Sequence, residues 1–157
     1  TRSDSCGAAE TWAKYFGKRQ EDLMGVGVYG DPGLAEAVKN DPLGIGYNNV
    51  NYAYDAKTRK PIEGIGIVPL DLNENGVVDE NEDFYSTRDQ IIEAISAGSY
   101  PSPPARELNL VTKGKFTQVA NEFVKWILTE GQKYALETGY VPLSEERRVE
   151  ELKKLEG

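Results

Sequence analysis

The sequence predicts an α/β fold in which helices pack on a parallel sheet. Short apolar runs of strand type occupy residues 23–29 and 45–47, and a helical pattern over residues 31–40 separates them. This strand–helix–strand order is typical of a parallel sheet whose crossover connection is a helix. A further strand-type run over residues 108–112 is followed by an amphipathic helical pattern over residues 116–128.

Five segments are expected to form helices, and several carry boundary signals. Asp31 followed by Pro32 is typical of a helix start, Ser86 is expected to cap another helix, and Gly98 is expected to end that one. Residues 62–70 alternate enough to predict an additional strand. The expected helices lie over about residues 6–17, 31–40, 86–98, 116–128 and 144–155.

Length and charge limit the classes of protein to consider. A chain of 157 residues can bury one hydrophobic core, and a charged content of 28% is typical of a soluble globular protein. The net charge of −8 argues against a nucleic-acid partner, since binding of nucleic acid requires a basic face. The longest apolar runs fall short of 18 residues, so no membrane-spanning helix is expected.

The chain has no histidine and one cysteine, which narrows the possible chemistry. A Ser-His-Asp triad, a Cys-His pair and histidine-ligated zinc all require histidine. One cysteine permits no internal disulfide. The thiol of Cys6 stands at an expected helix start, where thiols can become reactive, but the chain offers no histidine as its base. We therefore predict that the protein is not an enzyme, with a Cys6-dependent enzyme as a rival interpretation.

The start of the chain has the features of a small-anion site. The residues concerned are Arg2, Asp4, Cys6, Gly7 and Ala8. The first turn of a helix presents unpaired N–H groups and the positive end of its dipole, and an arginine adds a charge-assisted contact. A carboxylate at this place suits an anion that still carries a proton, as hydrogen phosphate does. The alternative is an ordinary helix N-terminus with a surface arginine.

This stretch resembles the Arg-x-Asp-x-Ser-Gly-Thr ligand motif of the phosphate-binding proteins that serve phosphate ABC transporters. In this sequence Cys6 takes the place of the serine and Ala8 that of the threonine, so two hydroxyl donors are replaced. The resemblance extends over nearly the whole chain except about residues 55–99. It is carried by residues 43–47, 100–114, 123–132 and 139–143.

The resemblance implies a fold of the type II periplasmic binding protein family, with lobes of three αβα layers. It implies that residues 1–54 form a portion of the anion-binding lobe and that residues 101–157 return to the other lobe. The implied function is capture of inorganic phosphate outside the cytoplasm for ABC permease subunits. It also implies a periplasmic or cell-surface location and an N-terminal remainder of the same protein, its signal segment included, that is absent from this chain.

The intervening segment, residues 55–100, contains a loop that matches an EF-hand at every defined position. A ligand loop of this kind needs oxygen donors at fixed spacing, a glycine for the tight turn and a final glutamate that binds through both oxygens. A calcium ion is predicted here as a structural cofactor, and an acidic surface turn is the alternative. A rival function is a calcium-dependent extracellular binding or adhesion module. The expected ligands are Asp71, Asn73, Asn75, the carbonyl of Val77, Asp79 and Glu82.

Overall fold

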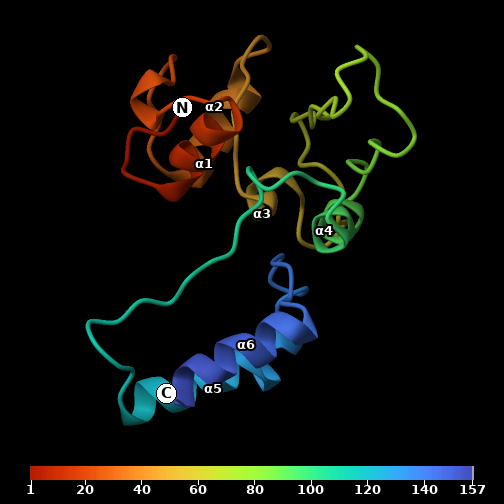
Figure 1. Cartoon of the computed structure of the whole chain (residues 1–157). Helices are drawn as coiled ribbons and strands as arrows, with labels where there is room; N and C mark the ends of the chain where they lie inside the picture. The colour runs from red at the N-terminus through yellow and green to blue at the C-terminus, as the bar shows by residue number, and fades with distance from the viewer. Residues whose placement is uncertain (157) are drawn as a thin grey trace. The chain divides into compact units, whose positions relative to one another are not determined.

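A computed structural model describes residues 1–156 of the chain, and Figure 1 labels its helices. The chain forms two compact units, Thr1–Arg106 and Glu107–Gly157. The first unit contains α1 (Gly7–Tyr15), the 3-10 turn η1 (Gln20–Asp22), α2 (Gly30–Asn40), α3 (Val50–Ala53) and α4 (Arg88–Ala97). The second contains α5 (Gln118–Leu128), η2 (Glu130–Tyr134) and α6 (Glu145–Glu156).

The predicted α/β fold with three-layer αβα lobes is wrong for this structure. The part of the chain that the structure describes is mostly helical and contains no β-sheet, only two isolated bridges, Arg2 with Val28 and Tyr54 with Pro61. A strand is stable only when its backbone groups pair with a neighbour. Apart from the single bridge of Val28 with Arg2, the four segments predicted as strands form no strand pairing among residues 1–156, and they contain no helix or sheet. They are residues 23–29, 45–47, 62–70 and 108–112.

The predicted helices are confirmed, with small shifts at their ends. Helix α4 begins after Thr87, whose hydroxyl accepts a hydrogen bond from the backbone of Gln90, so the cap is one residue later than the predicted Ser86. The left-handed backbone of Gly98 ends α4 as expected, with φ of 78°. The hydroxyl of Ser144 accepts from the backbone N–H of Arg147 at 3.2 Å and so caps the start of α6.

An aromatic cluster forms the core of the first unit. Tyr54, Tyr85 and Ile91 are buried together, and the Tyr54 hydroxyl donates to the carbonyl of Tyr85 at 2.8 Å. Burial raises the pKa of Tyr54 to about 12, because the phenolate would lose its hydration there. The cluster joins α4 to the end of α3. Partly buried side chains surround it: Val50, Ala53, Ile67, Phe84, Ile95 and Tyr100.

The second unit is built around α5 and α6. The side-chain amide of Asn121 on α5 donates to the carbonyl of Leu155 on α6 at 3.4 Å. Val124 and Leu128 supply the buried side chains of α5. Ahead of α5, the Glu107 carboxylate accepts from Arg147 on α6 at 2.7 and 2.9 Å, which fastens the start of this unit to its last helix.

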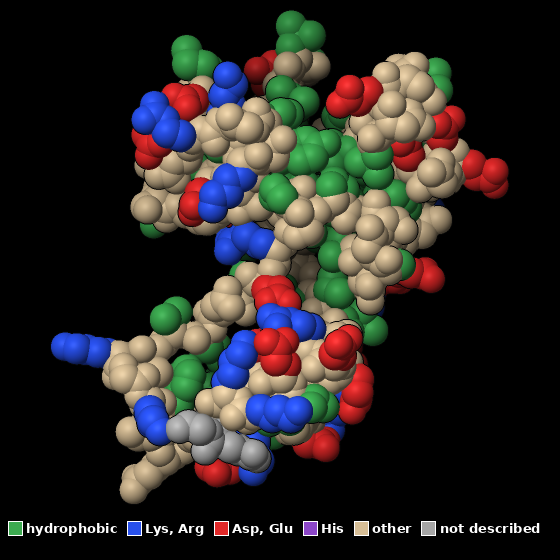
Figure 2. Space-filling view, in the orientation of Figure 1, with side chains coloured by type: hydrophobic (Ala, Val, Ile, Leu, Met, Phe, Trp, Pro, Cys, Tyr) green, Lys and Arg blue, Asp and Glu red, His purple; other side chains and the backbone are tan. Residues whose placement is uncertain are grey.

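Many large apolar side chains of the described residues are exposed, and hydrophobic side chains are visible on the face shown in Figure 2. The most exposed include Met24, Val26, Leu43 and Val111, all within the segments predicted as strands or beside them. Among the helices that the structure describes, none combines the length and the apolar character needed to cross a membrane.

Candidate functional site

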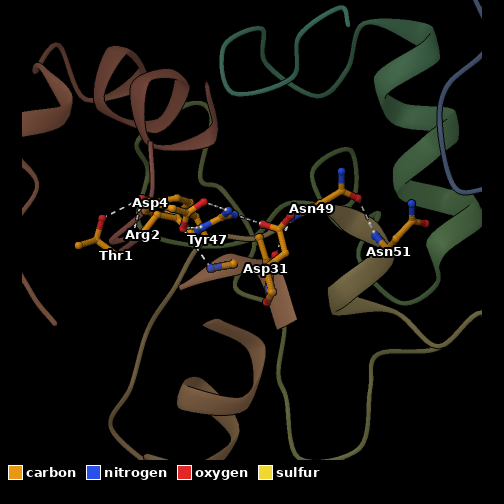
Figure 3. A network of polar contacts seen from close by, with 9 residues as sticks. Thr1, Arg2, Asp4, Asp31, Tyr47, Asn49 and Asn51 are labelled. Atoms are coloured by element: carbon orange, nitrogen blue, oxygen red, sulfur yellow. Dashed lines mark hydrogen bonds and ion pairs between the residues drawn. The ribbon is translucent and has the colours of Figure 1, made fainter. Parts of the chain in front are cut away.

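The guanidinium of Arg2 is held between two carboxylates, as Figure 3 shows. Its Nε donates to Asp4 Oδ1 at 2.8 Å and its Nη2 donates to Asp4 Oδ2, so this pair is a bidentate fork. The remaining nitrogen, Nη1, donates to Asp31 Oδ1. Only 9% of the Arg2 side chain is exposed. The arginine and the aspartate of the predicted anion motif are therefore brought together, with a second aspartate that the motif does not contain.

Two short segments of the first unit position this cluster. The backbone of Ser3 donates to the Val28 carbonyl at 3.0 Å, and the parallel bridge between Arg2 and Val28 aligns the two segments. The backbone N–H of Gly30, the first residue of α2, donates to Asp4 Oδ1 at 3.0 Å. Gly30 has a φ of 72°, a left-handed conformation that glycine adopts without strain.

Tyr47 connects the cluster to α1. Its hydroxyl accepts from the backbone N–H of Arg2 at 3.2 Å and shares a hydrogen bond with the Thr1 hydroxyl at 2.8 Å. The ring of Tyr47 in turn contacts the ring of Trp12 on α1, with 6.1 Å between the ring centroids. Tyr47 thus links the arginine cluster to the second turn of α1, while the backbone group that contacts the cluster, the N–H of Gly30, belongs to the start of α2.

The charges of the cluster stabilise one another. The hydrogen bonds that Asp4 accepts from Arg2 hold the pKa of its carboxyl well below the usual range, and the hydrogen bond from the backbone of Gly30 has a smaller effect in the same direction. The pKa of Arg2 is raised, chiefly by the hydrogen bond to Asp4 and further by the charge of Asp31, which together outweigh the lowering effect of burial. A carboxyl whose pKa is lowered by folding stabilises the folded state above its ordinary pKa. That contribution is lost as the pH falls towards strong acid.

The start of α1 has no side-chain cap, which is compatible with the anion-site hypothesis. Cys6 is the N-cap residue, and its side chain makes no capping hydrogen bond. Gly7 and Ala8 begin the first turn of the helix. The guanidinium of Arg106 lies against this turn. A Cβ atom added to Gly7 would be only 2.6 Å from Nη2 of Arg106. A side chain at position 7 would therefore displace the guanidinium, which is the far end of a flexible side chain.

Sequence reasoning missed two charged residues at the site. Asp31 is expected to cap a helix, but it lies inside the first turn of α2, whose N-cap is Tyr29, and its side chain pairs with Arg2. Arg106 follows a proline-rich stretch far along the chain, and no local signal points to Gly7.

Hydrogen bonds between side chains and backbone groups of the predicted calcium loop stabilise its conformation. The carboxylate of Asp71 accepts from the backbone N–H groups of Asn75 at 3.2 Å and of Gly76 at 2.7 Å. Gly76 has a φ of 84°, as the tight turn requires. The carboxylate of Glu82 accepts from the backbone of Leu72 at 2.9 Å, and also from Asn73 and Asp79 at 3.2 Å each.

The donor set of this loop has the chemistry of a calcium site, but its side chains bond to one another. Asp79 Oδ2 accepts from the amide nitrogens of Asn73 at 2.7 Å and of Asn75 at 2.8 Å. Over residues 1–156, no three or more side chains of His, Cys, Asp or Glu gather closely enough to hold a metal ion. Carboxylate, amide and carbonyl oxygens are nonetheless the ligands that calcium prefers. A calcium ion would require the two amide groups to turn their oxygens inward.

Comparisons of the chain with protein-family models, with curated proteins and with solved structures find no match.

Proposed function

We propose that this protein binds inorganic phosphate, as the extracytoplasmic solute-binding subunit of an ABC importer does. The observation that carries the proposal is the pairing of Arg2 with Asp4 directly ahead of the uncapped start of α1. A buried guanidinium and a helix N-terminus are both groups that bind oxyanions, and Arg2 precedes the first residue of α1, Gly7, by five positions. The partners in this proposal are the phosphate ion and the permease subunits that receive it.

The anion would be bound by local dipoles and charges. The backbone N–H groups of Cys6, Gly7 and Ala8 would donate to its oxygens, and Arg2, which is already paired with Asp4 and Asp31, would add a positive group. The guanidinium of Arg106 beside Gly7 adds a second positive group at the same helix start. A chain of net charge −8 is compatible with such a site, because nearby groups outweigh distant ones. Binding of this kind involves capture and release without a chemical step.

Replacing Arg2 by lysine is expected to weaken phosphate binding about tenfold, because the charge remains while the planar fork of donors is lost. The measurement is isothermal titration of the folded chain with inorganic phosphate, with sulfate titrated in parallel. Arg19→Lys is the matched control, since Arg19 forms an exposed ion pair with Asp22 on η1. Equal phosphate affinity in Arg2→Lys and the unchanged chain, or no binding by the unchanged chain at millimolar phosphate, would contradict the proposal.

We also propose that residues 71–82 bind a calcium ion that stabilises the first unit. The ligands in this proposal are the side chains of Asp71, Asn73, Asn75, Asp79 and Glu82 with the carbonyl of Val77. Support comes from the loop itself, which already has the tight turn at Gly76 and a buried glutamate at its last position. Calcium would replace the two amide donors on Asp79 as the positive partner of that carboxylate.

Calcium at a hundredfold excess over its dissociation constant is expected to raise the free energy of unfolding by about 2.7 kcal/mol, because the ion binds the folded loop alone. Thermal melting with calcium and with a chelator measures the effect. Asp71→Asn should abolish the difference, whereas Glu80→Gln, an exposed neighbour that is not a predicted ligand, should preserve it. A melting temperature that is the same with chelator and with calcium would reduce the loop to an acidic turn. Calcium binding without phosphate binding would instead favour the adhesion-module alternative.

A further inference from the structure

We propose that Asp31 competes with the bound anion for Arg2 and thereby sets the affinity of the phosphate site. This inference rests on the proposed function, since it concerns the same guanidinium. In the structure, Asp31 stands where an anion would contact Arg2 Nη1. An anion that binds this part of the guanidinium must displace the carboxylate or share the donor with it.

The geometry of Arg2 limits where an anion can bind. Asp4 occupies the edge formed by Nε and Nη2, and Asp31 lies on Nη1, which belongs to the other edge. Because 9% of the Arg2 side chain is exposed, the surrounding chain covers most of the group. A bidentate contact with an oxyanion needs two neighbouring donor nitrogens, and the pair that Asp4 leaves includes Nη1.

Asp31 is the carboxylate that is easier to displace. Asp4 is held by two nitrogens of Arg2 and by the backbone N–H of Gly30, whereas Asp31 is held by Arg2 through one oxygen. Asp31 also lies in the first turn of α2, where the helix dipole favours a negative charge. A displaced Asp31 carboxylate therefore keeps a favourable electrostatic position.

The net charge of the cluster also indicates that Asp31 opposes anion binding. One guanidinium and two carboxylates carry a net charge of about −1, which repels an incoming anion. Replacing Asp31 by asparagine leaves Arg2 paired with Asp4 alone and makes the cluster neutral. A purely structural ion pair would behave differently, because its loss would lower the melting temperature without raising affinity for phosphate.

Asp31→Asn is expected to tighten binding of inorganic phosphate about fivefold, the size of effect associated with one partly exposed ion pair. Isothermal titration at fixed ionic strength measures it, and Asp31→Ser provides a second variant that removes the carboxylate while keeping a residue suited to a helix start. Asp31→Glu should bind as the unchanged chain does. Asp22→Asn is the matched control, since it removes one negative charge from an exposed pair elsewhere.

The outcomes separate this inference from the proposed function. If the unchanged chain binds phosphate and Asp31→Asn and Asp31→Ser bind it equally well or more weakly, the competition is overturned. The phosphate proposal then still stands. Binding in neither the unchanged chain nor these variants overturns both. Binding that is tighter in both variants, or detectable only in them, and unaltered in Asp22→Asn supports the competition.

Discussion

Replacing Glu82 by alanine is expected to lower the free energy of unfolding of the first unit by about 3 kcal/mol, because three backbone donors lose a charged partner. Glu82 is 1% exposed, and its carboxylate accepts from the backbone N–H groups of Leu72, Asn73 and Asp79. Alanine has no side-chain acceptor for these N–H groups, and water has little access to so buried a position. The measurement is urea unfolding in the presence of a chelator, so that calcium makes no contribution.

The control for this variant comes from the same loop. Glu80 is exposed, and Glu80→Ala should change the free energy of unfolding by no more than about 0.5 kcal/mol. A loss below about 1 kcal/mol in Glu82→Ala would mean that the carboxylate does not organise the loop. The comparison tests the role of Glu82 in folding separately from any role in binding calcium.

Replacing Ile91 by alanine is expected to lower the free energy of unfolding of the first unit by about 3 kcal/mol, since a large side chain is removed from a packed core. Ile91 is 6% exposed and lies in the cluster with Tyr54 and Tyr85. Urea unfolding measures the loss. Glu93→Ala, on the exposed face of the same helix α4, is the control for changes in helix propensity.

A second measurement on the Ile91 variant uses the tyrosines. Burial raises the pKa of Tyr54 to about 12, so part of the tyrosine absorbance should titrate well above the usual range in the unchanged chain. A neutral phenol that is favoured by folding stabilises the folded state below the ordinary tyrosine pKa, and the contribution is lost as the pH rises towards 12. Loosening of the cluster in Ile91→Ala should move this titration to lower pH. An unchanged titration together with unchanged stability would show that Ile91 is not a core residue.

The helices of this protein could be predicted because their signals are local. The apolar spacing over α5, the left-handed Gly98 after α4 and the cap at Ser144 each depend on a few neighbouring residues. The strands could not be predicted in the same way. Residues 23–29 and 108–112 have strand-type composition, but a strand also needs a partner along its length, and the described residues provide only the isolated bridge of Val28 with Arg2. The α/β prediction failed at this step.

The candidate site shows the same division between local and distant information. Arg2 and Asp4 are two residues apart, and their proximity to one another follows from the sequence. Asp31 reaches Arg2 only because the bridge between Arg2 and Val28 brings the start of α2 to the start of the chain. Arg106 reaches Gly7 from the far end of the first unit. Contacts of this kind are set by tertiary packing, which residue spacing does not encode.

The contact between Gly7 and Arg106 also bears on the order of folding. It joins residues about 100 positions apart, so its formation closes a long loop and carries the entropy cost of that closure. The contact between Asn121 and Leu155 in the second unit closes a much shorter loop. Since folding slows as contacts become less local, the second unit is expected to fold faster than the first. The start of α1 would receive its second guanidinium only late in folding, after most of the first unit has formed.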